Sequence, residues 1–301
     1  MDSTLVLRGI LVLLVLFHHL PAYSGHPLVS FVQSSSGRYA VALFFFMSGY
    51  GLTLQYGKAG DGFFQNFFSK RYTKLLIPYI VAWLLYFSLS GNYSVDAWLE
   101  RVLTGENIIP FAYFVEELAL FYALYYICFR FLSSHYAMLL MFALTLGLMC
   151  SFYFMGWNDH WWISSLGFPL GILVCRYRHY FCRLNAVSIL WTALSVALLV
   201  WARDSALYLR VLCFALLLVP SACFLLSMIF PAIKWATYSP LQYLGKISYE
   251  TYIFQGIALM LLLPYSLEVN ALLIGGVAVV LGFVFSAVDK KLSSLAMRLL
   301  Q

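Results

Sequence analysis

The sequence predicts an all-α polytopic membrane protein, and its composition is the first reason. Of the 301 residues, 63% are hydrophobic and only 10% are charged, whereas about a quarter of the residues in a soluble domain are charged. Aromatic residues make up 19% of the chain, which suits a bilayer protein because Tyr and Trp favour membrane interfaces. No polar stretch is long enough to form a separate soluble domain, so we expect one integral-membrane domain over residues 1–301.

The second reason is the spacing of the apolar segments. A membrane-spanning helix needs about 20 mostly apolar residues, and polar or Gly/Pro-containing breaks divide the chain into about ten candidate spans. These are residues 5–23, 40–56, 75–90, 109–131, 134–154, 161–175, 186–201, 208–229, 243–265 and 271–288. We therefore expect about ten transmembrane helices.

The distribution of Lys and Arg predicts how these spans are oriented. With the N-terminus in the cytoplasm, only Arg38, Arg101, Arg203 and Arg210 of the 18 Lys and Arg residues fall on the outer side. This excess of inner cations follows the positive-inside rule. It predicts that both the N-terminus and the C-terminus are cytoplasmic.

Several classes of function are not indicated by the sequence. There is no basic tract or zinc-finger spacing, so we expect no nucleic-acid partner. The six cysteines are scattered through apolar segments without any C-x-x-C pair. We therefore expect neither a metal site nor a disulfide framework.

The first span contains ionisable residues, which are costly in a membrane and so are candidates for function. Arg8 and His19 are separated by about three helical turns, which places them on one face about 16 Å apart. His18 points about 100° away from that face. Each residue alone also fits a structural role, Arg8 as a snorkelling charge and His19 as an interfacial polar group. Their common face favours a functional pair, with His19 preferred over His18.

Two further groups lie on the predicted cytoplasmic side. In "FFSKRYTKLLIPY" (residues 67–79), Arg71 and Lys74 are neighbours on a helix. Such a pair binds phosphates, although it also fits a cluster that meets anionic lipid. In "LGKISYETYIFQ" (residues 244–255), Tyr249 and Tyr252 recur on roughly one face, which fits either a ligand surface or an interfacial tyrosine belt.

Two adjacent acids, Glu116 and Glu117, lie at or just within the outer end of the span at residues 109–131. Carboxyl groups in such a position are candidates for catalysis. Solvation at the outer interface explains them about equally well. Nearby, "GFPLG" (residues 167–171) has small residues four apart, which indicates close helix packing.

Four short motifs occur in order along the chain. They are Arg8 with His19, "FFFMSGYG" at residues 44–51, Arg71 and Lys74 ahead of Pro78 and Tyr79, and "GKISYETYI" at residues 245–253. Each is weak alone, but together they resemble the membrane-bound acyltransferase-3 family over about residues 4–290. Three positions depart from the family pattern: Lys74 replaces an arginine, Gln255 stands where histidine is common, and Tyr113 stands where tryptophan is usual.

The resemblance implies a single integral-membrane acyltransferase domain. Members of the family transfer an acyl group, usually acetyl, from cytoplasmic acyl-coenzyme A (acyl-CoA) to a hydroxyl of a cell-surface polysaccharide or lipid-linked sugar. Acyl-CoA is thus the expected donor co-substrate, with no metal, and the expected partners are membrane lipid and the carbohydrate acceptor. The expected location is the bacterial cytoplasmic membrane, as a multi-pass protein.

The residues then suggest a mechanism. Arg8, Arg71 and Lys74 would bind the donor phosphates, with Tyr249 and Tyr252 as further donor contacts. The pantetheine arm, on the order of 20 Å long, is comparable to the Arg8–His19 rise of about 16 Å.

His19 would be the general base at the end of that arm, with Glu116 or Glu117 orienting it. A transient acyl-histidine is an open alternative. The main rival function is a transporter or flippase of a polar lipid or sugar, which predicts an internal repeat that the sequence does not show. A catalytically inactive assembly protein is a second rival.

Overall fold

The computed structural model describes residues 4–19, 27–90, 95–181, 240–262 and 267–299, with a few isolated residues between 190 and 201. Across these residues the secondary structure is helical and contains no strand, which confirms the all-α prediction. The helices are α1 (Thr4–His19), α2 (Pro27–Ala59), η1 (Gly60–Phe64), α3 (Phe67–Ser90), α4 (Val95–Thr104), α5 (Tyr113–Phe131), α6 (Ser134–Phe154), α7 (His160–Ile163), α8 (Gly167–Arg176), α9 (Arg178–Phe181), α13 (Pro240–Lys246), α14 (Ser248–Leu262) and α15 (Leu267–Leu299).

Three described helical segments are long and apolar enough to cross a membrane. They are Phe67–Leu89, Ser134–Phe154 and Leu273–Arg298, while the apolar segment Leu5–His19 is shorter. This supports a helical membrane protein. The predicted spans at 186–201 and 208–229 lie largely outside the described residues. The number of spans and the side on which the termini lie therefore stay predictions.

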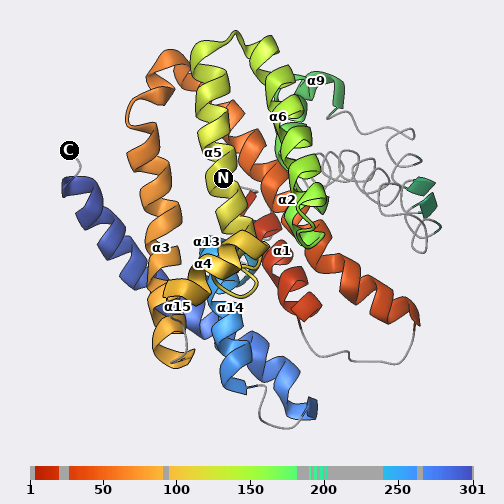
Figure 1. Cartoon of the computed structure of the whole chain (residues 1–301), viewed down its shortest axis with the longest axis vertical. Coiled ribbons are helices and arrows are strands. Elements are labelled where there is room, and N and C mark those ends of the chain that lie inside the picture. Colours follow the sequence, from red (N-terminus) through yellow and green to blue (C-terminus); the bar gives the residue numbers. More distant parts are fainter. Residues whose placement is uncertain are drawn as a thin grey trace.

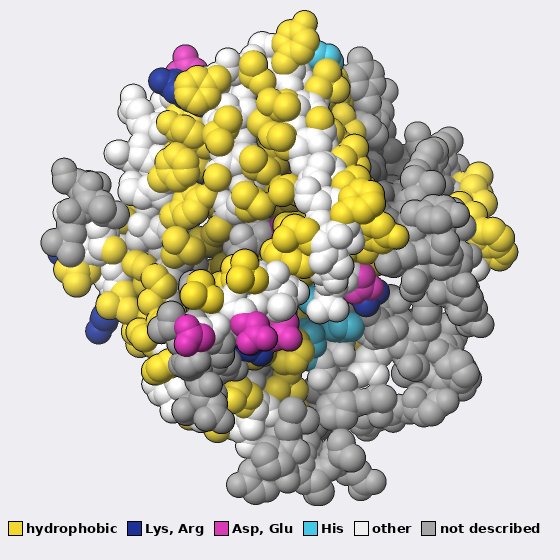
Figure 2. Space-filling view, in the orientation of Figure 1, with side chains coloured by type: hydrophobic (Ala, Val, Ile, Leu, Met, Phe, Trp, Pro, Cys, Tyr) yellow, Lys and Arg dark blue, Asp and Glu magenta, His cyan; other side chains and the backbone are white. Residues whose placement is uncertain are grey.

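The outer surface of the helices has the character of a lipid-facing surface. Large apolar side chains are exposed along α3, α5 and α6, including Ile80, Leu84, Ile127, Leu139 and Leu146. Figure 2 shows these apolar side chains covering one broad face, with charged side chains gathered around α4 at its lower edge. An exposed apolar area of this extent is rare on a soluble monomer and is typical of contact with lipid.

Some helix boundaries differ from the sequence prediction. α2 begins at Pro27 rather than near residue 40, because the polar turns before residue 40 find partners on α1. There the Gln33 amide donates to the Phe17 carbonyl oxygen, and the Ser36 hydroxyl donates to the carbonyl oxygen of Leu14. The predicted span 161–175 is divided into α7 and α8, and Pro169 lies in the first turn of α8. Its missing N–H is tolerated in a first turn, so Pro169 marks the start of a helix.

Glycines set the closest helix contacts, as predicted for "GFPLG". A methyl group added at Gly171 would lie 2.0 Å from the Phe46 carbonyl oxygen, and one at Gly167 would lie 2.2 Å from that of Ala42. Such contacts leave no space for a side chain, and they hold α2 against α8. In the same way, Gly245 of α13 lies against the backbone of Leu5 in α1. Figure 1 shows α1 at the centre of the molecule, where it packs against α2, α13 and α14.

Candidate active site

A cavity of about 600 Å³ lies where α1, α2, α3, α5, α13, α14 and α15 meet. All five residues that the sequence suggested as donor contacts line it, although they come from three separate parts of the chain. These are Arg8, Arg71, Lys74, Tyr249 and Tyr252. Three further lysines complete a set of six cations: Lys70, Lys246 and Lys290. We call this space the cationic cavity.

The cations of the cationic cavity are not held in ion pairs by the described residues. Within the described residues, none of its six cations forms an ion pair with a carboxylate, and the two ion pairs seen there lie elsewhere. Arg71 instead donates to the Gln55 amide oxygen and lies over the Phe63 ring, 5.6 Å from its centroid. Unpaired cations gathered around one cavity attract a polyanion. Phosphate groups are the ligands that Arg and Lys bind best in such an arrangement.

A second, smaller cavity of about 240 Å³ contains the histidines of α1. His18 and His19 line it together with Arg38, Phe111 and Tyr252. We call this space the histidine cavity. Tyr252 lines both cavities, so they adjoin at its side chain. Helix α1 therefore contributes Arg8 to one cavity and His19 to the other, as the spacing of the two residues predicted.

The two histidines have different surroundings. The Nδ1 atom of His18 lies 2.9 Å from the Gln33 carbonyl oxygen. Because a carbonyl only accepts, Nδ1 carries the hydrogen in this contact. The His19 ring contacts the rings of His18 and Phe111, at centroid distances of 4.8 and 4.4 Å. Both imidazoles line the cavity, so the choice between them is left to experiment.

Phe111 reaches His19 from a loop, residues 105–112, that joins α4 to α5. Its φ of +66° lies in the left-handed region, which a phenylalanine adopts only when its surroundings hold it there. The Tyr252 hydroxyl donates to the Phe111 carbonyl oxygen over 2.6 Å. The loop is thus tied to the tyrosine that separates the two cavities.

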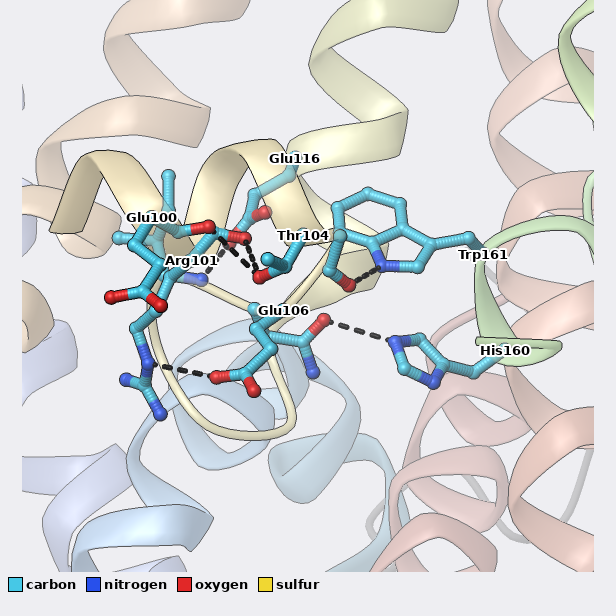
Figure 3. A network of polar contacts seen from close by, with 10 residues as sticks. Glu100, Arg101, Thr104, Glu106, Glu116, His160 and Trp161 are labelled. Carbon is cyan, nitrogen blue, oxygen red and sulfur yellow. Dashed lines mark hydrogen bonds and ion pairs between the residues drawn. The ribbon is translucent and has the colours of Figure 1, made fainter. Parts of the chain in front are cut away.

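Other side chains fix the same loop, as Figure 3 shows. His160 Nε2 lies 3.1 Å from Asn107 Oδ1, and the Trp161 indole N–H donates to the Gly105 carbonyl oxygen over 2.6 Å. Burial lowers the pKa of His160 to about 4, so its imidazole is neutral at physiological pH. A neutral ring that faces an amide oxygen carries its hydrogen on Nε2, which makes His160 the donor.

The structure places Glu116 and Glu117 away from His19. The Glu116 carboxylate accepts from the Tyr79 hydroxyl over 2.5 Å and from the Ile108 backbone N–H over 3.2 Å. Glu117 is only 2% exposed and accepts from the Ser165 hydroxyl. Neither carboxylate lines the histidine cavity. Their assignment to catalysis beside His19 stays a prediction, and the observed contact of Glu116 is with the loop that carries Phe111.

The sequence reasoning missed one charged pair of the histidine cavity. Arg38 of α2 and Asp159, which precedes α7, form an ion pair of 3.0 Å. Both line the cavity, as do Asn107 and His160. Arg38 counted only as one of the few outer cations, and "GWNDH" only as a polar break between spans. The four residues lie on three separate segments, and no spacing rule connects them.

These features define a helical membrane protein in which a cavity lined by cations adjoins a cavity lined by histidines. The sequence profile of the acyltransferase-3 family, described as an acyltransferase domain, matches residues 5–288. The chain therefore belongs to the acyltransferase-3 family and is an acyltransferase of the membrane. The assignment does not favour the transporter alternative. No curated protein and no solved structure matches the chain significantly.

Proposed function

We propose that the protein transfers an acyl group, usually acetyl, from acyl-CoA to a hydroxyl of a cell-surface polysaccharide or lipid-linked sugar. One observation carries the proposal: the cavity with six cations adjoins the cavity with the histidines, and Tyr252 lines both. This arrangement suits a donor whose charged end is far from its reactive end. Acyl-CoA has that form, with phosphates at one end and a thioester at the other.

The donor would bind with its phosphates among Arg8, Arg71 and Lys74. The cavity volume of about 600 Å³ lies within the usual range for small-molecule sites. From there the pantetheine arm would run along α1 and past Tyr252. The rise of about 16 Å between Arg8 and His19 is comparable to the length of the arm.

The transfer itself would take place in the histidine cavity. An acceptor hydroxyl would lose its proton to the imidazole of His19 as its oxygen attacks the thioester carbonyl carbon. A C–O bond forms, the C–S bond breaks, and the thiolate of coenzyme A leaves with the electron pair. The imidazolium then returns the proton to that thiolate, so charge and atoms balance. A two-step route through an acyl-histidine uses the same groups.

The proposed setting is the cytoplasmic membrane of a bacterium, crossed by about ten helices with both termini in the cytoplasm. The excess of inner Lys and Arg supports this orientation. It places the cationic cavity on the side where acyl-CoA is made. The reaction as written uses acid–base chemistry of the protein and needs no metal ion.

The deciding experiment follows labelled acetyl-CoA in membranes that contain wild-type protein or the His19→Ala, His18→Ala or Arg8→Ala variant at matched expression. We expect turnover by the wild type, its loss in His19→Ala and Arg8→Ala, and retention of most activity in His18→Ala. Loss of turnover in His18→Ala alone would identify His18 as the general base. Equal turnover by all four proteins would reject the roles assigned to His19 and Arg8, and no wild-type turnover with any acyl-CoA would reject acyl-CoA as the donor.

A further inference from the structure

Two carboxylates line the cationic cavity, and nothing in the proposed function uses them. They are Glu250 of α14 and Asp289 of α15. Asp289 is only 2% exposed, and among the described residues neither of its side-chain oxygens has a hydrogen-bond partner. The Oε2 atom of Glu250 likewise has none. Buried carboxylate oxygens normally have partners because an unpaired one is costly, so this pair indicates a ligand that donates hydrogen bonds.

The acids lie near cations, and Lys290 interacts electrostatically with Glu250 without a direct ion pair. In the part of the chain that the structure describes, neither Glu250 nor Asp289 forms an ion pair with a cation of the cavity. Two carboxylates also weaken the binding of phosphate at close range. A site for phosphates alone would have no use for them.

The cavity has two chemically different sides. Helix α3 supplies Lys70, Arg71 and Lys74. On α15, a stripe at helical spacing combines the acid with hydroxyl and apolar groups: Asp289, Ser293 and Met297. Because α15 packs against both α3 and α14, this stripe faces the same space as the cations. The α3 side thus presents cations alone, whereas the α15 side presents an acid and hydroxyl groups beside Lys290 and so also suits a group with hydrogen-bond donors.

We propose that Asp289, with Glu250 beside it, binds the adenosine half of the acyl-CoA donor. This inference rests on the proposed function, since it specifies which residues of the same cavity recognise the adenosine of the donor. The adenine amino group and the ribose hydroxyl donate hydrogen bonds to carboxylate oxygens, whereas phosphates only accept. Binding of adenosine at α15 and of phosphates at α3 fixes the orientation of the donor. The arm is then directed towards Tyr252 and the histidine cavity.

The test compares kcat/KM of wild type and Asp289→Asn for three donors that carry the same acetyl thioester. Acetyl-CoA contains adenosine, S-acetyl-4′-phosphopantetheine lacks it, and S-acetyl-N-acetylcysteamine lacks most of the arm as well. Thiol release is followed in membranes that retain the native acceptor. We expect the efficiency with acetyl-CoA to fall about tenfold, since hydrogen bonds to charged groups are the stronger class. The efficiencies with the two truncated donors should change less than about twofold.

Matched variants separate recognition from folding. Glu250→Gln should give a smaller effect of the same pattern, because one oxygen of Glu250 rather than two is unpaired. Asp96→Asn makes the same chemical change on exposed α4, outside both cavities, and should leave all three efficiencies as in wild type. An equal loss with every donor, or no loss with any, would overturn the proposal. A loss of efficiency shared only by acetyl-CoA and S-acetyl-4′-phosphopantetheine would show that Asp289 contacts the pantetheine arm. That result would also overturn the proposal.

Failure of the proposed function gives a different result. If the wild type turns over none of the three donors, the acyltransfer proposal is rejected. Binding then decides the inference. Coenzyme A or 4′-phosphopantetheine is added to detergent-solubilised wild type and to Asp289→Asn, and the shift in melting temperature is measured for each pair. A loss of the coenzyme A shift alone in Asp289→Asn supports adenosine recognition, and equal shifts in both proteins reject it.

Discussion

The cationic cavity and the histidine cavity differ in how the chain builds them. The first is lined mainly by side chains from regular helices, among them α1, α3, α14 and α15. The second is also lined mostly by helical residues, but it adds Asn107 and Phe111 from the loop at residues 105–112 and Asp159 from the segment before α7. Spacing along helices pointed to five members of the first cavity, Arg8, Arg71, Lys74, Tyr249 and Tyr252. Only the folded chain identifies most members of the second, because they share no spacing.

The largest effect expected from this comparison is on catalysis in the histidine cavity. Replacement of His19 by Ala removes the proposed base, and general-base catalysis contributes about 10²–10⁴-fold. We therefore expect kcat for acetyl transfer to fall at least hundredfold, while KM for acetyl-CoA stays within about threefold. Steady-state kinetics in membranes measures both values. A rise in KM with kcat intact would place His19 in donor binding instead.

A substitution in the cationic cavity should give the opposite kinetic pattern. Arg71→Ala removes one of the proposed phosphate contacts, and a hydrogen bond to a charged group is worth about 1.5–3 kcal/mol. KM for acetyl-CoA should rise by about ten- to hundredfold with a smaller change in kcat. Arg130→Ala removes an arginine that lines neither cavity and serves as the control. An unchanged KM in Arg71→Ala would show that Arg71 does not contribute to donor binding.

A packing substitution should damage both cavities together. Gly171→Ala brings a methyl group to 2.0 Å from the Phe46 carbonyl oxygen. The strain should lower the free energy of unfolding by about 1–3 kcal/mol and disturb α2, which contributes to each cavity. Unfolding in detergent measures the loss. The control is Gly147→Ala, where the added methyl group meets nothing within 4 Å, and it should be close to neutral. Similar losses of stability in both variants would show that the close α2–α8 contact does not limit stability.

The smallest effect concerns the ion pair of the histidine cavity. Arg38 and Asp159 are each about one-third exposed, with side-chain exposures of 35% and 31%. Such pairs contribute about 0.2–1 kcal/mol. A double-mutant cycle with Arg38→Ala and Asp159→Ala should give a coupling energy in that range. A coupling well above about 1 kcal/mol would show that the pair is a main support of the cavity rather than one contact among several.

The sequence by itself determined the all-α class and the membrane character, and it singled out five of the residues that line the cationic cavity. Hydrophobic composition and helical spacing carry this information, because an α-helix places residues such as Arg8 and His19 on one face wherever it packs. It also indicated the close α2–α8 contact through the small residues of "GFPLG".

The tertiary structure decided what depends on contacts between distant segments. It joined Arg38 with Asp159, and it directed Glu116 to the Tyr79 hydroxyl and the loop rather than to His19. It also brought Asp289 into the cationic cavity. Hydropathy detects how much apolar surface a segment has, but which polar groups meet depends on the packing of helices and on loop conformation. A single sequence does not encode those contacts in any local pattern, and for that reason they emerged only from the fold.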